Sequence, residues 1–472
     1  MRPLRPWLLA IVLLLAYGCG ASAALFPGPD DLEVTAGQRL RPIVARADGV
    51  AVFLGWHDTL LDVDCGFRLG ADLEWRCLPV VWRVVFLDAA CEQPALRLGE
   101  CGHDDRYGGL ATDPEDRCIG GIGDAFHQLY ERQPGIVEAT TYYDVDRTGV
   151  CTATPVDLEP DEILVPAAPV PMETFVRSEP TVVGTGRLRR VEHVAEDGAR
   201  EPIAGYDTDL AQACIPSSFG PWALDAEIRC VPERPSYGSS RFVDASCTQP
   251  AASATCGETV LEEHDAETCT RRFFALGAPT TSSYEVDGGT CQAVSDLAVA
   301  AIGEELPASS FPPVSLTTKG DERLQVRSYT GNGVSIGQPQ RRSLFDRELD
   351  TDCEPAALEG GGYRCVPRAS ARAKAFADEA CTEPVIVTRT NACGDGNPFT
   401  YVWERPEPRV CGFPATGLVF RRVLDPLTAT TVHTLDDQGG CLPRPLEADE
   451  VAQSLAAPEL ADAFPEVTVA IE

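Results

Sequence analysis

The hydrophobic positions of this chain fall in short runs that are rich in β-branched and aromatic residues and that Gly and Pro interrupt. Runs of this kind predict β-strands, because branched and aromatic side chains pack well on a pleated surface. Helical patterns are scarce, and the two best candidates are Asp296 to Glu305 and Glu447 to Ala457. The chain is therefore predicted to be all-β, with many short antiparallel strands. The clearest expected strands are Leu40 to Arg46, Val50 to Gly55, Val80 to Leu87, Thr140 to Tyr143 and Thr416 to Val423.

One nine-residue pattern, Phe-x-Asp-x-x-Cys-x-x-Pro, occurs three times, at residues 86–94, 242–250 and 376–384. Other landmarks repeat around it in the same order. Each copy begins with an Arg-Leu pair before an Asp-Gly or Asn-Gly turn, and it contains an Arg-Cys-(Leu/Val)-Pro segment. Repetition over so long a period indicates repeated domains rather than a short solenoid unit. The predicted division is an N-terminal segment of residues 1–23, followed by modules at residues 24–180, 181–316 and 317–472.

The repeated turns lie at Asp48-Gly49, Asp197-Gly198 and Asn332-Gly333. Between extended segments they predict tight hairpins, because a type I′ turn needs positive φ at both central residues. Six further aspartates recur at matched positions. Carboxylates for catalysis or Ca²⁺ are one interpretation of them, but we favour acceptors of backbone N–H bonds at turns. In the nine-residue pattern we expect the Phe to pack, the Cys to crosslink and the Pro to end a strand. The six aspartates are Asp58, Asp207 and Asp346, and Asp88, Asp244 and Asp378.

Nineteen cysteines are present, and none of them forms a C-x-x-C pair. This usage is typical of disulfides in an oxidising compartment, not of zinc ribbons, redox motifs or haem attachment. Cys19 lies in the N-terminal segment, and the other cysteines form three sets of six. Our hypothesis is sequential pairing, since each pair would then bracket a likely hairpin. It predicts Cys65–Cys77, Cys91–Cys101, Cys118–Cys151, Cys214–Cys230, Cys247–Cys256, Cys269–Cys291, Cys353–Cys365, Cys381–Cys393 and Cys411–Cys441.

The chain of 472 residues carries a formal charge of −33 at pH 7. A field of this sign repels nucleic acid and anionic membranes, and no Lys/Arg-rich run compensates it. We therefore predict no nucleic-acid partner. A solubilising surface is the favoured interpretation of the charge, and a cation-binding surface is the alternative. Lysine is almost absent, since Lys319 and Lys374 are the only two.

The N-terminal segment resembles an export signal. A basic start precedes an apolar run from Leu8 to Tyr17, which is too short to span a bilayer. Leu15 to Cys19 is similar to a bacterial lipobox, although the two residues before Gly18 depart from its usual pattern, and Ala21-Ser22-Ala23 suits ordinary signal peptidase. We favour the lipobox, which would acylate Cys19 and anchor the protein without a spanning helix. The predicted location is an outer-membrane lipoprotein, or a secreted or periplasmic protein, with membrane contact only through this anchor.

Taken together, four motifs resemble an uncharacterised cysteine-rich repeat family of secreted proteins and lipoproteins of the myxobacterial type. They are the Asp-Gly hairpin, the aromatic-Asp-(x)6-Cys segment, Arg-Cys-(Leu/Val)-Pro and Phe-x-Asp-x-x-Cys-x-x-Pro. The resemblance covers nearly all of the mature chain. It implies export and a β-rich fold, and it implies no activity.

Several clusters have the residue types of a metal or catalytic site. Asp144 to Gly149 begins like a calcium loop, but Pro155 stands where an EF-hand needs Glu, so we favour a hairpin turn and keep Ca²⁺ as the alternative. His103-Asp104-Asp105, Glu262 to Asp265 and Asp395 to Asn397 are interpreted as solvated loops or polar turns. No H-E-x-x-H, G-x-S-x-G or Walker motif is present. We therefore predict no catalytic, metal-binding or cofactor-binding residue.

Two arrangements of the modules stay open, a propeller-like ring of β-meanders and three β domains in a row. In a ring, Val467 to Ile471 would be the closing strand against the N-terminal part. The favoured function is a non-catalytic binding or structural protein of the cell surface, whose partner is a protein or a polysaccharide. The alternative is a secreted, glycosidase-like hydrolase with carboxylates from different modules. Specificity is expected where the copies differ, in Gly102 to Arg117 and in Gly337 to Ser343.

Overall fold

The computed structural model confirms that the chain is all-β. Among the residues that it describes, every element is a strand except two short 3-10 turns, η3 (Met172–Thr174) and η4 (Ala308–Ser310). The description covers residues 34–472 apart from 80, 99–105, 112–125, 146–149, 157–161, 220–226, 234–235, 255–257, 266–269, 295–297, 339–341, 358–361, 372–374, 390–399, 405–418, 437–439 and 461–462.

The two expected helices are wrong, because both segments are strands. Residues 296–305 overlap β23 (Val299–Leu306), and residues 447–457 contain β37 (Glu450–Leu455). Each of these strands lies between two others, β23 between β18 and β20 and β37 between β32 and β34. Pairing on both edges satisfies their backbone groups and overrides the helical pattern of the sequence.

Each module begins with an antiparallel meander that belongs to one large sheet. Neighbouring strands within a meander follow one another in sequence, as tight hairpins require. The first meander is β1 (Leu40–Ala47), β2 (Val50–Asp58), β3 (Val63–Leu69) and β4 (Trp75–Pro79). The second is β13 (Leu188–Ala195), β14 (Arg200–Asp207), β15 (Gln212–Phe219) and β16 (Glu227–Pro232). The third is β25 (Leu324–Gly331), β26 (Val334–Gly337), β27 (Leu344–Asp346), β28 (Thr351–Ala357) and β29 (Tyr363–Pro367).

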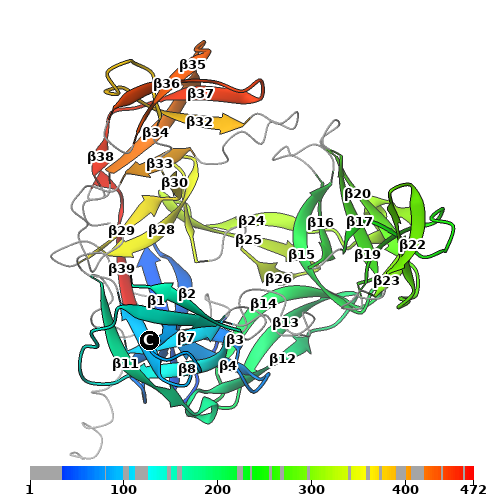
Figure 1. The fold of residues 1–472 in the computed structure, drawn as a ribbon, viewed down its shortest axis with the longest axis horizontal. Helices are drawn as coiled ribbons and strands as arrows, with labels where there is room; N and C mark the ends of the chain where they lie inside the picture. The colour runs from blue at the N-terminus through cyan, green and yellow to red at the C-terminus, as the bar shows by residue number, and fades with distance from the viewer. Residues whose placement is uncertain are drawn as a thin grey trace, which may run out of the picture.

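Two linking strands and one isolated bridge, between Arg229 and Pro313, join the meanders edge to edge into a closed ring. The strand β12 (Arg177–Val183) pairs with β4 and β13, and β39 (Glu466–Ile471) pairs with β29 and β1. The strand β24 (Ser315–Lys319) pairs with β25, and just before it Pro312 accepts the Cys230 N–H at 2.9 Å from β16. The C-terminus therefore lies beside the first strands (Figure 1). This confirms the expected closing strand. The ring is one continuous sheet from β16 to β24, whose two ends meet at the isolated bridge, instead of separate propeller blades.

A second sheet in each module forms a lobe outside the ring. In the first lobe, antiparallel pairs and one parallel pair, β5 with β7, close five strands into a small barrel. In Figure 1 the second lobe lies at the right and the third at the upper left. The first lobe is β5 (Trp82–Phe86), β6 (Pro94–Leu98), β7 (Tyr107–Ala111), β8 (Phe126–Arg132) and β11 (Ile163–Val170), with the hairpin β9 (Thr141–Val145) and β10 (Cys151–Pro155).

The other two lobes repeat this plan, including the projecting hairpin. The second lobe is β17 (Ser236–Phe242), β18 (Pro250–Ser253), β19 (Val260–Asp265), β20 (Thr270–Leu276) and β23, with the hairpin β21 (Ser283–Asp287) and β22 (Thr290–Val294). The third is β30 (Ala369–Ala371), β31 (Ala375–Phe376), β32 (Pro384–Arg389), β33 (Tyr401–Glu404), β34 (Val419–Pro426), β37 and β38 (Glu459–Leu460), with the hairpin β35 (Thr431–Leu435) and β36 (Cys441–Pro445).

At each junction in the ring, the first hairpin of one module packs on a disulfide of the preceding module. The Cys65–Cys77 pair shares a core with Ala195 and Ala199 of the second module. The other two junctions are built in the same way. Cys214–Cys230 packs against Val334 and Ile336 of the third module. Cys353–Cys365 packs against Val50 and Val52 of the first module. These three disulfides confirm the sequential pairing for the ring. Their burial in apolar clusters explains why the first two cysteines recur in every copy.

The turn residues of these hairpins hold the preceding module by its backbone. The Asp197 carboxylate accepts the N–H groups of Arg39 at 3.0 Å and Leu40 at 2.7 Å. The Asp48 carboxylate accepts the N–H of Leu324 at 2.9 Å. Asp48 and Gly49 have φ values of 51° and 75°, as the predicted type of turn requires.

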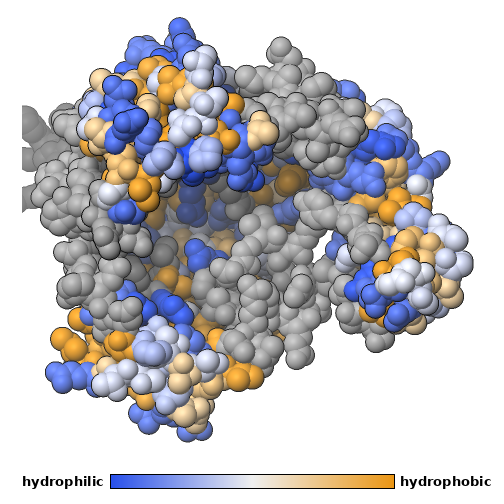
Figure 2. Space-filling model, turned by 45° about the horizontal axis from the view of Figure 1, so that its top comes forward, coloured by the Kyte–Doolittle hydropathy of each residue, from blue (hydrophilic) through white to orange (hydrophobic). Residues whose placement is uncertain are grey.

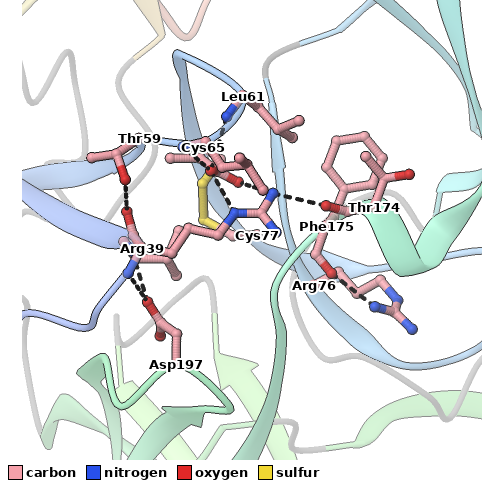
Figure 3. A network of polar contacts seen from close by, with 12 residues as sticks. Arg39, Thr59, Leu61, Cys65, Arg76, Cys77, Thr174, Phe175 and Asp197 are labelled. Carbon is pink, nitrogen blue, oxygen red and sulfur yellow. Dashed lines mark hydrogen bonds and ion pairs between the residues drawn. A yellow bond between two sulfur atoms is a disulfide. The ribbon is translucent and has the colours of Figure 1, made fainter.

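An Arg–Asp ion pair repeats in all three meanders and supports the structural interpretation of the first set of aspartates. Asp58, Asp207 and Asp346 are each at most 1% exposed. Arg39, Arg187 and Arg323 donate two guanidinium N–H groups to these carboxylates at distances of 2.6–3.1 Å. Arg39 also donates to the Thr174 carbonyl at 2.8 Å (Figure 3). The pair therefore joins the first strand of each meander to the end of the second.

The second set of aspartates caps the corner that the nine-residue pattern forms. Asp88, Asp244 and Asp378 each accept the backbone N–H groups four and five residues later, at 2.7–3.0 Å. The cysteine of each corner is in the left-handed region, with φ of 52°, 50° and 53°. The Pro does not end a strand as expected, because it begins the next one, β6, β18 or β32.

The corner cysteines pair with the projecting hairpins, so the sequential scheme is wrong for the lobes. The disulfides are Cys91–Cys151, Cys247–Cys291 and Cys381–Cys441. Each hairpin pairs with the strand before the corner, as β9 does with β5, and this places its cysteine beside the corner. Cys101, Cys118, Cys256, Cys269, Cys393 and Cys411 lie outside the described residues. The pairs that these disulfides contradict are Cys91–Cys101, Cys118–Cys151, Cys247–Cys256, Cys269–Cys291, Cys381–Cys393 and Cys411–Cys441.

The capped corners make stability depend on acid pH. Hydrogen bonds from the Thr382 hydroxyl and the Glu383 N–H lower the pKa of Asp378 to about 2, and bonds from Ser246 and Gln249 hold that of Asp244 well below its usual range. A lowered folded-state pKa stabilises the fold above the unfolded pKa, and this stabilisation is lost as pH falls through the folded value. Asp378→Asn should therefore lose less stability than the wild type between pH of about 4 and about 2.

Acid titration of the free energy of unfolding, measured by urea denaturation, tests this expectation. Glu379→Gln is the matched control, because Glu379 is the exposed neighbour of Asp378 in the same turn. The Glu379→Gln profile should follow that of the wild type. Identical profiles for Asp378→Asn and the wild type across this pH range would refute the expectation.

Candidate functional site

A cavity of about 580 Å³ lies where the three meanders meet, and residues of all three modules line it. The first hairpin of module 1 contributes Val50 and Phe53, and β14 of module 2 contributes Glu201. Module 3 contributes the largest share, from Lys319 to Arg342. Figure 2 shows the molecule hollowed between its lobes, with hydrophilic and hydrophobic surface on either side. This size is in the range of small-molecule binding sites.

The sequence builds this cavity by a departure from the repeat. The second strand of every meander contains a bulge, at which the strand register skips Leu54, Ile203 and Ile336, and in module 3 this bulge lies two residues nearer the turn. In modules 1 and 2 the strand then continues to its aspartate, whereas in module 3 it stops at Gly337 and resumes at Leu344. The interruption coincides with one of the two loops in which specificity was expected.

The ends of this loop line the cavity through Gly337, Gln338 and Arg342. Gly337 has a φ of 136°, which lets the strand turn away where a side chain would be strained. The other expected loop, Gly102 to Arg117, lies largely outside the described residues, and its described part belongs to β7. Module 3 is thus the copy that differs from the others at the cavity.

The cavity has an apolar wall that the ring holds rigidly. Val34, Val50 and Ala51 are each 8% exposed and line it. Phe53 is half-buried in the wall, and its ring lies 5.0 Å from that of Trp56 in an edge-on contact. Trp56 itself is fully buried, so Phe53 is supported from behind.

Three carboxylates line the cavity, one from each module, namely Asp48, Glu201 and Asp321. Two of them have structural bonds. The Glu201 carboxylate accepts the Trp56 indole N–H at 2.9 Å, which joins modules 1 and 2. The Asp48 carboxylate accepts the Leu324 N–H, which joins modules 1 and 3. Asp321 is exposed at the rim.

Two cations also line the cavity, Lys319 and Arg342. Lys319 is one of only two lysines in the chain. Arg342 has a φ of 65°, an uncommon conformation for a residue with a side chain. Its Nη2 atom lies beside β2 and β3, 3.8 Å and 3.6 Å from where Cβ atoms on Gly55 and Gly66 would be. A basic side chain of module 3 therefore reaches across to module 1.

In the described part of the chain, the clusters that were considered as metal sites do not form a metal-binding group. There, no group of three or more His, Cys, Asp or Glu residues could hold a metal ion. Asp144 pairs with Arg83 at 2.7 Å, and Glu262 pairs with Arg271 at 3.3 Å. Residues 146–149 of the calcium-like loop, His103-Asp104-Asp105, Asp395 to Asn397 and the side chains of His264 and Asp265 lie outside the described residues. Among the helices that the structure describes, none is long and apolar enough to cross a membrane.

A buried Ser–His pair is a further group that the sequence did not indicate. Ser178 Oγ lies 3.2 Å from His193 Nδ1, between the first two meanders. The two residues are 1% and 3% exposed, and the rings of Phe67 and Trp75 each lie 4.8 Å from the imidazole. No substrate reaches a pair sealed in this way, so it packs the junction between modules.

Of the cavity residues, only the loop after Gly337 was indicated by the sequence. Phe53, Glu201 and Lys319 lie far apart in the chain, and their approach depends on ring closure. The sequence has one other feature that could have pointed to the cavity. Lysine is scarce in the chain, which makes Lys319 unusual at any position.

Comparison with known proteins gives one match. A model for a family of unknown function matches residues 55–457. Comparison with curated proteins and with solved structures finds no match.

Proposed function

Because the chain belongs to the family of unknown function DUF7481, we propose its role from the structure itself. We propose that it is an exported, disulfide-stabilised protein that binds a saccharide of the cell surface, without catalysis, in the cavity between the three modules. The observation that carries this proposal is that the ring departs from its repeat at the cavity. Equivalent residues in three copies serve the fold, and the loop after Gly337 has no such counterpart.

The lining of the cavity suits a saccharide. Sugar rings have apolar C–H faces that pack on aliphatic and aromatic side chains, which Val50, Phe53 and Val326 supply here. Their hydroxyl groups need donors and acceptors, and Ser328, Ser335 and Gln338 line the same space. A preformed wall loses little conformational entropy on binding.

Export and anchoring complete the proposal. Six disulfides among the described residues favour an oxidising extracellular or periplasmic environment. Residues 1–33, which include Cys19 and the competing site at Ala23, lie outside the described residues. The lipobox supports an outer-membrane lipoprotein, and cleavage after Ala23 would give a secreted or periplasmic protein.

A glycan array with the oxidised protein, repeated with and without Ca²⁺, tests the proposed function. We expect binding to a subset of oligosaccharides, with the same affinity in both conditions, since the described residues provide no cation site. Gln338→Trp places a large side chain at a partly exposed position of the lining outside the strands, so it should abolish binding while the melting temperature is retained. Absence of binding to every saccharide, or capture of a protein partner by the Gln338→Trp variant, would contradict the proposal.

A glycosidase-like hydrolase is the second candidate, and one observation favours it. Asp48, Glu201 and Asp321 come from three different modules and line one cavity, as an active site assembled by ring closure would require. The structural hydrogen bonds of Asp48 and Glu201 argue against it, because a catalytic acid must exchange its proton with the substrate. Release of reducing ends from any bound oligosaccharide, abolished by Asp321→Asn, would establish the hydrolase instead.

A further inference from the structure

We infer that the ligand of the cavity is an acidic saccharide, and that Arg342 binds its carboxylate. This inference rests on the proposed function and specifies the chemical class of the saccharide. A uronic acid has three features that match the lining of the cavity, namely an apolar ring face, hydroxyl groups and a planar carboxylate.

Arg342 is placed at the cavity with an unusual backbone conformation. Its backbone is in the left-handed region, which is uncommon for a residue with a Cβ. The guanidinium lies over two glycines on the facing strands, Gly55 and Gly66, at ordinary van der Waals distance from where their Cβ atoms would be. In module 2 the corresponding positions are Ala204 and Ile215, as the pairing of Gly205 with Cys214 and of Trp56 with Cys65 shows. Module 1 therefore presents only backbone to the guanidinium at these two positions, where module 2 has side chains.

Arg342 differs from the other arginines of the ring in its contacts with carboxylates. Most arginines of the ring contact a carboxylate, as Arg39, Arg187 and Arg323 do, but in the described part of the chain Arg342 has no such contact. Two of the three cavity carboxylates are engaged elsewhere, Asp48 by Leu324 and Glu201 by Trp56. The guanidinium is thus available to a ligand, and its planar fork matches a carboxylate with two parallel hydrogen bonds.

Because the protein is acidic overall, the positive charge of Arg342 matters for the binding of an anionic ligand. A surface of net charge −33 repels anions, so an acidic ligand needs local positive charge. Lys319 and Arg342 both line the cavity and supply positive charge there. A neutral saccharide would form no ion pair with Arg342.

Calorimetric titration with two matched ligands tests the inference. The first is a tetramer of galacturonate, and the second is the same tetramer with each carboxylate reduced to a hydroxymethyl group. We expect the acidic tetramer to bind more tightly than the reduced one, and Arg342→Gln to weaken its binding by about 10- to 100-fold. Arg342→Gln should leave any binding of the reduced tetramer unchanged. Arg389→Gln is the control, because it removes an equally charged side chain that is 66% exposed in the third lobe.

The outcomes separate the two proposals. Equal binding of both tetramers, or equal losses for both in Arg342→Gln, would overturn the assignment of the carboxylate and leave saccharide binding standing. Binding of neither tetramer, together with binding of other neutral saccharides on the array, would overturn the acidic class alone. Binding of no saccharide at all would overturn both proposals.

Discussion

Deletion of residues 466–472 is expected to open the ring and to lower the free energy of unfolding by about 5 kcal/mol or more. These residues form β39, which pairs with β1 on one edge and with β29 on the other. Val467 is 4% exposed, and its burial alone accounts for about 1.5–3 kcal/mol. Loss of the strand also removes several backbone hydrogen bonds of about 0.5–1.5 kcal/mol each. A loss of this size is comparable to the total stability of an ordinary domain.

Thermal unfolding and size-exclusion chromatography measure this effect. The truncated protein should melt far below the wild type and elute as aggregates, because two sheet edges become free to pair between molecules. Glu472→Gln is the matched control, since it removes only the ion pair with Arg46, whose Nε lies 2.7 Å from Glu472 Oε1. That variant should lose at most about 1 kcal/mol. A truncated protein that stays monomeric and melts within a few degrees of the wild type would show that the ring does not depend on β39.

Asp207→Ala is expected to destabilise the protein by about 3–5 kcal/mol. The Asp207 side chain is fully buried and accepts Arg187 Nε at 2.9 Å and Nη2 at 2.8 Å. It also accepts the N–H of Asp209 at 3.0 Å. Removal of the carboxylate leaves a partly buried guanidinium without its main counter-charge and a backbone N–H without an acceptor. The corresponding Asp58 and Asp346 should show losses of the same order.

Asp209→Ala is the control for this prediction, because Asp209 contacts the same arginine. Its carboxylate lies 3.0 Å from Arg187 Nε, but its side chain is 64% exposed. Water can replace an exposed carboxylate, so we expect a loss of about 0–1 kcal/mol. Urea denaturation of the oxidised variants measures both values. Equal losses for the two substitutions would mean that burial of Asp207 does not determine its contribution.

The repeated fold could be predicted from the sequence because its determinants are local. The Asp48-Gly49 turn, the capping role of Asp378 and the closing strand at Val467 to Ile471 each depend on a few neighbouring residues. Threefold repetition also favoured structural roles for Asp58 and its counterparts, and the buried ion pairs support these roles. Local chemistry of this kind is visible in a single chain.

The features that were wrong or missed depend on contacts between distant segments. The β23 and β37 segments have helical patterns, but each becomes a strand because it pairs with a neighbouring strand on both edges. Cys91 pairs with Cys151, 60 residues away, because β9 returns to β5. The cavity collects Phe53, Glu201 and Arg342 from three modules, and no spacing in the sequence specifies that meeting.

Three copies of one module form a closed ring around a cavity. Hydrogen exchange of the backbone amides in the oxidised, full-length protein tests this closure most directly. Closure predicts that the amides of β39 at Glu466–Ile471 exchange as slowly as those of β2 and β3, since both of its edges are paired. Exchange of these amides at the rate of an unprotected chain terminus, with β2 and β3 still protected, would contradict the closed ring.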